Sequence, residues 1–199
     1  MAEYPAHLAA ERRLRDGRTV LIRPIRAEDQ ALEQRFFDSL SAHTRCLRFM
    51  KPVTAVNARL VHFFTHVDYD RHMAFVCERA GNLVGEARYV ANPGGRSCEF
   101  AVVVADDWHR SGIARLLIEA LIDAARARGM ETMEGLVLRE NPAMLRFVEK
   151  LGFELSPEPH EPTIVRVVKK LGGAERATIG AGEAPLGRAR APGAGIVPR

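Results

Sequence analysis

A glycine-bearing turn between two apolar segments has the residue types of an anion-binding site. Residues 99–105 form a mostly apolar run, a short polar stretch follows, and residues 111–114 (Ser-Gly-Ile-Ala) begin a long amphipathic segment. A strand that feeds a helix through such a turn presents free backbone N–H groups to an anion, with the positive end of the helix dipole behind them. The pattern therefore predicts a site for a phosphate or a pyrophosphate.

Two elements must position this turn. Apolar residues recur at helical spacing after it and predict one long helix that ends near Gly129: Ile113, Leu116, Leu117, Ala120, Leu121 and Ala124. Before the turn, Phe100 and the three valines at 102–104 lack polar alternation, which favours a central strand covered on both sides.

The rest of the chain predicts further strands and helices. Ser41 and Thr54 are candidate N-caps of two short helices, and Asn141 followed by Pro142 is a strong helix start. The predicted elements in chain order are an edge strand at 18–25, helices from residues 27, 41 and 54, a hairpin of 72–79 and 82–91, the central strand, the long helix, a strand at 131–138, a helix from 141, and strands at 153–155 and 163–168.

The turn does not match the two best-known phosphate motifs. A Rossmann turn needs G-x-G-x-x-G, and a P-loop needs Lys and Ser or Thr after its second Gly; neither is present. Residues 109–114 (His-Arg-Ser-Gly-Ile-Ala) instead resemble the acyl-CoA signature of the GNAT N-acetyltransferase superfamily, Q/R-x-x-G-x-G/A. Trp108 before the signature and the leucines at 116 and 117 after it strengthen the resemblance.

A narrower resemblance is to the GNAT domain of bacterial Pat-type protein lysine acetyltransferases. It is carried by residues 14–41, 45–49, 67–76, 98–117 and 139–154. The resemblance implies an α/β (α+β) GNAT fold, with a central mixed, mostly antiparallel sheet of six to seven strands flanked by helices. We expect an N-terminal extension at 1–9, the GNAT domain at 10–171, and a disordered tail at 172–199, where Gly, Ala, Pro and Arg dominate.

The same resemblance implies how acetyl-CoA is held as a cosubstrate. The backbone of the central strand would pair with the pantetheine arm, the turn would surround the pyrophosphate, and a superfamily Asn would contact the cofactor arm. The implied cofactor-binding residues are Val102, Val103, Val104, His109, Arg110, Ser111, Gly112, Ile113, Ala114, Arg115 and Asn141. For Asn141, a helix cap alone is an equally good interpretation.

Acetyl transfer to an amine also benefits from a base. A free lysine with a pKa of about 10.4 is neutral only about once in 10³ near pH 7, so a group that takes up its proton is useful. The resemblance places an acid at Glu99, at the start of the central strand, and we predict that Glu99 is the general base. Its alternative is a solvent-exposed acid at a strand end, and Glu134 is a second candidate base.

Two positions depart from the superfamily pattern. His109 replaces the usual Gln or Arg of the signature, which predicts a weaker, pH-sensitive contact with an anion. Val148 stands where many members carry a Tyr that protonates the leaving thiolate. Either the thiolate leaves unassisted, with a thiol pKa of about 8.5, or another donor such as Tyr89 serves.

Composition limits the remaining classes. The 199 residues carry a net charge of +4 and no run long enough for a transmembrane helix, and three separated cysteines suggest neither disulfides nor a zinc site. We expect a cytoplasmic protein, a monomer or homodimer, with no metal and with neither nucleic acid nor membrane as partner. The histidines at 62 and 66 have metal-ligand spacing, but we interpret them as one helix face.

These observations lead to one main hypothesis and two alternatives. The main one is an acetyl-CoA-dependent N-acetyltransferase that acts on a protein lysine by direct transfer. The alternatives are a small-molecule amine acetyltransferase and a non-catalytic acyl-CoA-binding regulatory module, which the departures at His109 and Val148 leave open.

Overall fold

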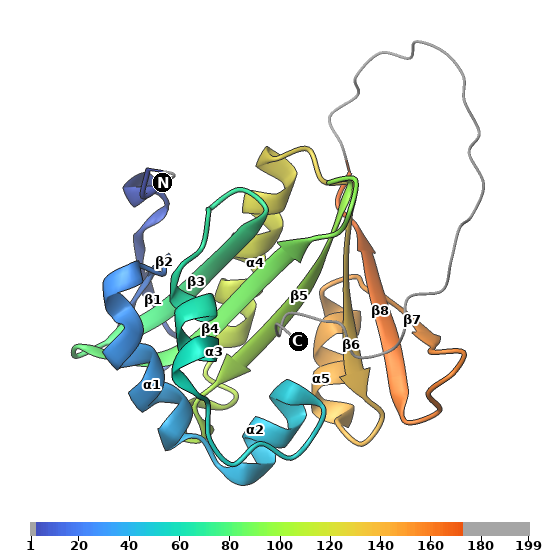
Figure 1. Ribbon diagram of the computed structural model, residues 1–199, viewed down its shortest axis with the longest axis horizontal. Helices are drawn as coiled ribbons and strands as arrows, with labels where there is room; N and C mark the ends of the chain where they lie inside the picture. Colours follow the sequence, from blue (N-terminus) through green and yellow to red (C-terminus); the bar gives the residue numbers. More distant parts are fainter. Residues whose placement is uncertain (1–2, 173–199) are drawn as a thin grey trace.

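One open sheet forms the centre of the molecule (Figure 1). The structure is a computed structural model, and it describes residues 3–172. The strands are β1 (Ala10–Arg13), β2 (Thr19–Pro24), β3 (His72–Arg79), β4 (Asn82–Ala91), β5 (Ser97–Val104), β6 (Thr132–Leu138), β7 (Glu154–Pro157) and β8 (Ile164–Lys170). The sheet order is β1-β2-β3-β4-β5-β6-β8-β7, and every pair is antiparallel except β5 with β6.

Helices cover both faces of this sheet (Figure 1). Those over one face come from the N-terminal half of the chain, and the two over the other face follow β5 and β6. The helices are α1 (Gln30–Ser39), α2 (Ala42–Phe49), α3 (Ala58–Thr65), α4 (Ile113–Ala127) and α5 (Pro142–Lys150). Three short 3₁₀ turns are η1 (Ala6–Leu8), η2 (Ala27–Asp29) and η3 (Asp106–Trp108). This is the mixed, mostly antiparallel architecture that the sequence predicts.

Side-chain alternation along β5 divides the core in two. Phe100 and Val104 face α4 and α5, in a cluster with Leu117, Leu121 and Val148. Val103 faces the other helices and belongs to a separate cluster that is rich in phenylalanine: Phe36, Phe37, Phe49 and Phe64. Glu99 lies on the same face as Val103, since residues two apart on a strand share a face. Both faces of β5 are covered, as the apolar run predicts.

Three local predictions are wrong or incomplete. The strand near 18–25 is not an edge strand, because β1 pairs outside it; β1 (AERR) is exposed and carries no apolar alternation, so the sheet has eight strands rather than six to seven. Helix α3 is capped by Asn57, whose side chain accepts from the Leu60 amide, and not by Thr54.

The other predicted helix starts are confirmed. Ser41 accepts a hydrogen bond from the Thr44 amide and caps α2, and Asn141 accepts from the Met144 amide and caps α5. The proposed extension at 1–9 is described from residue 3, and Tyr4 packs there against Tyr69. Of the predicted tail at 172–199, all but its first residue lies outside the described residues.

Candidate active site

Strands β5 and β6 meet over a very short length. Only three residue pairs join them in register, from Ser97 with Thr132 to Glu99 with Glu134. Both strands then continue for several residues without pairing with each other, and Figure 1 shows them diverging toward their carboxyl ends. The polar main chain of β5 beyond Glu99 therefore has an unpaired edge.

Packing on the α4 side stabilises this divergence. Gly135 follows the last β6 residue that pairs with β5, and a Cβ atom placed there would lie 2.8 Å from the ring of Phe100. That ring packs against Phe153, with 5.1 Å between the ring centroids. A side chain at residue 135 would therefore compete with Phe100 for one space.

On the open edge of β5, the main-chain N–H and C=O groups that point into the gap are those of the even-numbered residues. The Ala105 amide donates to the Val84 carbonyl of β4, which fixes the odd-numbered main-chain groups on the β4 side. In an antiparallel ladder the alternate residues point their N–H and C=O groups the other way. Val102 and Val104 thus direct their main-chain groups toward the gap, while the side chains of Val103 and Val104 are buried.

The turn after β5 keeps several amides unbonded. Arg110 and Gly112 have positive φ angles of 63° and 96°, which brings the chain sharply into α4. The amides of His109, Ser111 and Arg115 donate to carbonyls within the turn. Three other amides, those of Arg110, Gly112 and Ala114, donate to no backbone carbonyl of residues 3–172. The amide of Ile113 reaches only the Ser111 hydroxyl, at 3.4 Å.

A neutral His109 imidazole has one N–H group, and it is used in a hydrogen bond within the protein. Its Nε2 lies 3.0 Å from the Val104 carbonyl oxygen, and since a carbonyl only accepts, Nε2 carries the proton. The imidazole therefore fastens the turn to the end of β5. A neutral His109 has no second N–H to offer to an anion.

The two candidate bases lie side by side but differ in their surroundings. Glu99 and Glu134 are register partners, so both side chains project from the same face. Glu134 is held on both oxygens: Asn92 donates to one at 2.6 Å, and Arg166 forms an ion pair with the other. Glu99 is half-buried and is close enough to Arg48 of α2 to stabilise its charge.

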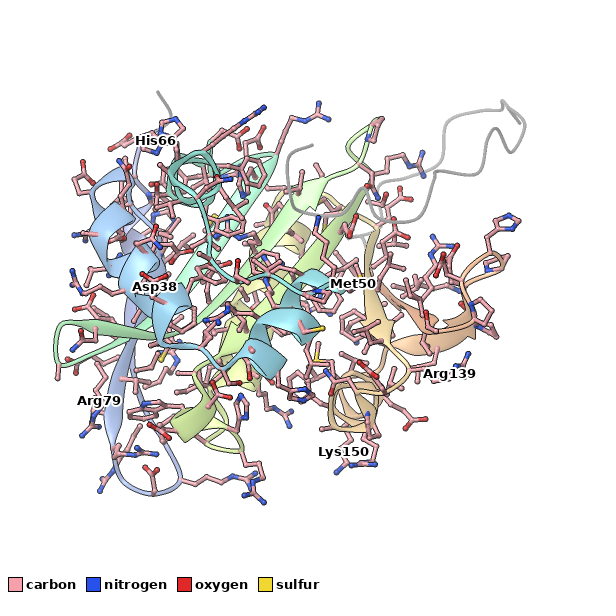
Figure 2. The ribbon with its side chains drawn as sticks, turned by 60° about the horizontal axis from the view of Figure 1, so that its bottom comes forward. Asp38, Met50, His66, Arg79, Arg139 and Lys150 are labelled. Atoms are coloured by element: carbon pink, nitrogen blue, oxygen red, sulfur yellow. The ribbon has the colours of Figure 1, made fainter. Side chains whose placement is uncertain are left out.

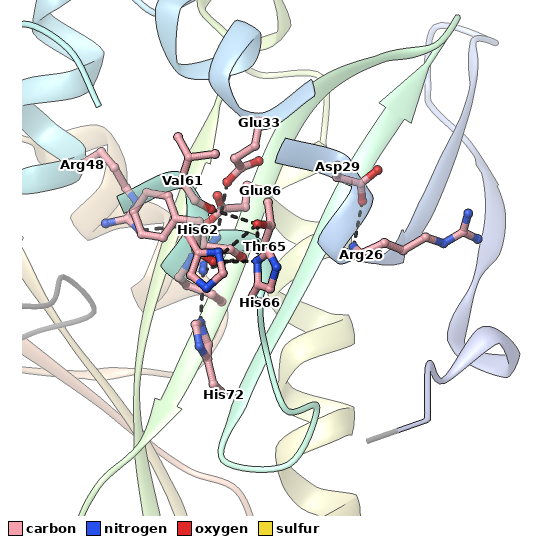
Figure 3. Close-up of polar contacts among 12 residues, drawn as sticks. Arg26, Asp29, Glu33, Arg48, Val61, His62, Thr65, His66, His72 and Glu86 are labelled. Carbon is pink, nitrogen blue, oxygen red and sulfur yellow. Dashed lines mark hydrogen bonds and ion pairs between the residues drawn. The ribbon is translucent and has the colours of Figure 1, made fainter. Parts of the chain in front are cut away.

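Next to Glu99, the same face carries a cluster of buried ionisable groups that we call the buried charge cluster: Glu33, Arg48, His72, Glu86 and Arg88. The first four of these are labelled in Figure 3. Arg88 is its hub. It donates to Glu86 at 2.6 Å, to the Phe64 carbonyl at 3.1 Å, and to His72 Nε2 at 3.1 Å. Glu33 lies 3.4 Å from the same guanidinium.

Protonation explains how two acids share this space. Burial and the nearby charge of Glu86 raise the pKa of Glu33 well above its usual range. Burial alone would raise the pKa of Glu86 as well, but the charge of Arg88 and a hydrogen bond from Glu33 outweigh it and lower that pKa. Glu33 is therefore the acid of the pair that favours the protonated form, and Glu86 is the one that favours the ionised form. Burial, followed by the charge of Arg88, lowers the pKa of His72 to about 3, so this imidazole is neutral.

The sequence pattern alone does not reveal this cluster. Glu86 and Arg88 alternate with Ala87 and Tyr89, a pattern typical of a strand with one solvent-exposed face. Helices α1, α2 and α3 cover that face instead. One feature of the sequence could have indicated the cluster: Glu86 and Arg88 have opposite charges and lie two residues apart, on one face of a strand. Buried charges require partners of opposite sign.

A second polar contact ties α2 to the turn that follows β5. Asp106 accepts from the Ser41 hydroxyl and the Thr44 hydroxyl, each at 2.7 Å, and from the Ser41 amide at 2.9 Å. Partial burial would raise the pKa of Asp106, but these hydrogen bonds outweigh it and lower it to about 2. The end of β5 and the start of α2 are thereby fixed to each other. Figure 2 shows Met50, which follows α2, in front of the sheet.

Other candidate residues have structural roles. Val148 is fully buried in the core. The Tyr89 hydroxyl donates to the Asp70 carbonyl at 3.1 Å, and burial raises its pKa. His62 and His66 stack on each other with 3.6 Å between the ring centroids. Within residues 3–172, no group of three acidic, His or Cys side chains converges to hold a metal ion.

Similarity to known proteins agrees with this geometry. Residues 30–153 match the acetyltransferase (GNAT) family, so the chain belongs to that family. It is an acetyl-CoA-dependent N-acyltransferase, as the family and its named relatives indicate.

The relatives include proteins of known structure. An acetyltransferase of Pseudomonas aeruginosa is 38% identical over 156 residues, covering 76% of this chain and 84% of that protein. The crystal structure of the GNAT domain of S. lividans PAT superposes with a TM-score of 0.80 and 30% identity, covering 84% of this chain and 99% of that one. The acetyltransferase Pat of Mycolicibacterium smegmatis is 30% identical over 58% of this chain, which spans only 34% of that protein.

No helix in the described part of the chain combines the length and apolarity required to cross a membrane.

Proposed function

We propose that this domain transfers the acetyl group of acetyl-CoA directly to a primary amine, with a protein lysine as the acceptor and Glu99 as the general base. The observation that carries the proposal is the geometry of β5: its edge opens where Glu99 ends the pairing with β6, and its far end leads into a turn with unbonded amides. The similarity to two Pat proteins supports lysine as the acceptor.

The open edge suits an extended thioester. A pantetheine arm contains amide groups, and the main chain of Val102 and Val104 would pair with it as one more strand. The Val104 carbonyl already accepts from His109, so its amide and both groups of Val102 are the available partners. The amides of Arg110, Gly112 and Ala114, at the start of α4, would bind the pyrophosphate.

Glu99 lies on the opposite face from Phe100, next to the cover formed by α2. An amine that approaches from this side would meet the thioester carbon across the strand gap. Glu99 takes one proton from the ammonium, and the neutral nitrogen then forms the new C–N bond with the thioester carbon. The C–S bond breaks to release the thiolate, and the second proton of the nitrogen passes to solvent. A backbone N–H of β5 would polarise the carbonyl during this step.

The thiolate leaves without an acid from the protein. Val148, at the usual Tyr position, has no proton to donate, and the Tyr89 hydroxyl is committed to the Asp70 carbonyl. A thiol with a pKa of about 8.5 leaves readily as the anion near neutral pH. The departures at His109 and Val148 are therefore compatible with catalysis.

Replacement of Glu99 tests the proposal. The full chain is incubated with acetyl-CoA, a thiol-detecting reagent and a panel of lysine peptides, polyamines and amino acids. We expect lysine peptides to release CoA, and Glu99→Gln to reduce kcat by about 10²–10⁴-fold while the Kd for CoA is unchanged.

Glu134→Gln is the matched control, because this neighbouring acid is already held by Asn92 and Arg166. It should reduce kcat far less than Glu99→Gln. The reverse ranking would move the base to Glu134, and CoA binding without turnover of any amine would support the regulatory module.

A small-molecule amine is the second candidate acceptor. The L-methionine sulfoximine/L-methionine sulfone acetyltransferase of Pseudomonas aeruginosa is 32% identical over 53% of this chain. Faster release of CoA with methionine sulfoximine than with lysine peptides would favour this alternative.

A further inference from the structure

Arg48 of α2 is a buried cation whose donors are not fully used. Its side chain is only 3% exposed, and neither Nε nor Nη2 has a hydrogen-bond partner within the described residues. Its nearest acid is Glu86, at 4.0 Å, which is too far for a hydrogen bond. A buried donor without a partner destabilises the folded protein, so this arrangement needs an explanation.

The charges around Arg48 do not cancel within the cluster. Arg48 and Arg88 are cations, Glu86 is ionised, Glu33 is protonated and His72 is neutral. Burial lowers the pKa of Arg48 to about 10, with the charge of Glu86 opposing the change, so Arg48 remains cationic near pH 7. Two cations thus face one carboxylate ion.

Glu99 is an acid on this face whose charge acts on Arg48. Arg88 and Glu86 of β4 pair with Ala101 and Val103 of β5. Glu99 lies two and four residues before these partners, so its side chain projects from the same face of the sheet. Its charge stabilises the cationic form of Arg48.

We propose that Arg48 is a positioning residue for Glu99: its buried guanidinium, fixed by α2 between Glu86 and Glu99, orients the Glu99 carboxylate and keeps it ionised to receive the amine proton. This inference rests on the proposed role of Glu99. It gives the buried charge cluster a purpose beyond packing, because Arg88 fixes Glu86 by a hydrogen bond, and Glu86 lies 4.0 Å from Arg48 on the face of the sheet that carries Glu99.

The pH dependence of kcat tests the inference. With the amine that is acetylated fastest in the panel, and with both substrates saturating, Arg48→Met should move the acid limb of the kcat profile upward by about one pH unit. Arg48→Lys keeps the charge and should restore most of that displacement. A purely structural role would lower kcat equally at every pH.

A double-mutant cycle gives a second readout that does not depend on the pH profile. Because Arg48 acts through Glu99, Arg48→Met should reduce kcat at least tenfold in the wild-type chain but less than twofold in the Glu99→Gln chain. Equal reductions in both chains would overturn the inference.

Arg45→Met is the matched control on the same helix. Arg45 donates to the carbonyls of Leu40, Phe37 and Val53, so it fixes α2 without facing Glu99. It should lower the melting temperature and leave the acid limb in place. If Arg48→Met does not fold, Arg48→Lys decides: a kcat that is lowered by the same factor at every pH contradicts the inference.

Failure of the inference is distinguishable from failure of the proposed function. A wild-type chain that turns over no amine overturns both. Turnover that depends on Glu99 but has the same acid limb in wild type and Arg48→Met overturns the inference alone.

Discussion

The two faces of β5 are built from different materials. Toward α4 and α5, Phe100 and Val104 pack among aliphatic side chains in a continuous apolar core. Toward α1, α2 and α3, the phenylalanine cluster surrounds buried ions centred on Arg88, whose guanidinium carbon lies 4.1 Å from the Phe64 ring centroid. One face is ordinary packing, whereas the other keeps charges out of water at considerable cost.

The difference indicates where the fold serves chemistry. Replacing buried ion pairs by apolar residues is often neutral or stabilising, so stability alone does not account for the buried charge cluster. The cluster lies on the face of Glu99, and the apolar core lies on the face that supports the turn and α4. The apolar face therefore holds the sheet together, and the charged face is the one that would control the proton in the proposed mechanism.

The largest expected effect comes from removing the hub of the charged face. Arg88→Met leaves Glu86 buried without its main partner, and we expect a loss of about 3–5 kcal/mol in the free energy of unfolding, measured by urea denaturation. Arg96→Met, which removes the exposed pair with Glu131, is the control and should cost less than about 1 kcal/mol. Similar losses for both variants would mean that burial of the cluster is unimportant.

A smaller effect is expected on the apolar face. Gly135→Ala places a methyl group 2.8 Å from the Phe100 ring, which packs on Phe153 and has little room to move. We expect a loss of about 1–3 kcal/mol in the free energy of unfolding and weaker binding of CoA. In a Phe100→Leu background the same substitution should cost clearly less, and an unchanged cost would contradict the role of this contact.

The smallest expected effect is the change in stability with pH that comes from protonation of Glu33. Glu33 has a raised pKa in the folded protein, so folding takes up a proton once the pH exceeds the ordinary value of 4.5. Its contribution to stability therefore declines as the pH rises above 4.5, until the pKa of the folded state is reached. Glu33→Gln mimics the protonated form, and its stability relative to wild type should increase by about 1.4 kcal/mol from pH 5 to pH 6.

Urea denaturation at several pH values measures this difference. Glu28→Gln, an exposed acid next to α1, should show a difference from wild type that does not change with pH. A flat difference for Glu33→Gln as well would show that Glu33 is ionised in the folded protein.

Local patterns were enough to predict most of the fold. The helical stripe of α4, the apolar run of β5 and the Asn141-Pro142 start of α5 depend on residues close together in sequence, and all three are confirmed. Thr54 and Asn57 are both competent caps, and the choice of Asn57 depends on how α3 packs. Strand β1 has no internal pattern and exists because β2 offers it an edge.

The site was harder to predict for a physical reason. The turn at 109–114 is a contiguous motif, so its residues are visible in the sequence. Arg48, Glu86 and Glu33 lie on three different elements, and only the packing of helices on the sheet brings them together. Their charges look like solvated surface residues until that packing is known.

The three-pair junction between β5 and β6 has one more consequence. The sheet is in effect two smaller sheets, of five and three strands, joined by a narrow seam. A long ligand bound beside β5 would lengthen this junction by pairing with the main chain of β5, and would be part of the tertiary structure while it is bound. Binding of the thioester would then limit how far the two smaller sheets move relative to each other.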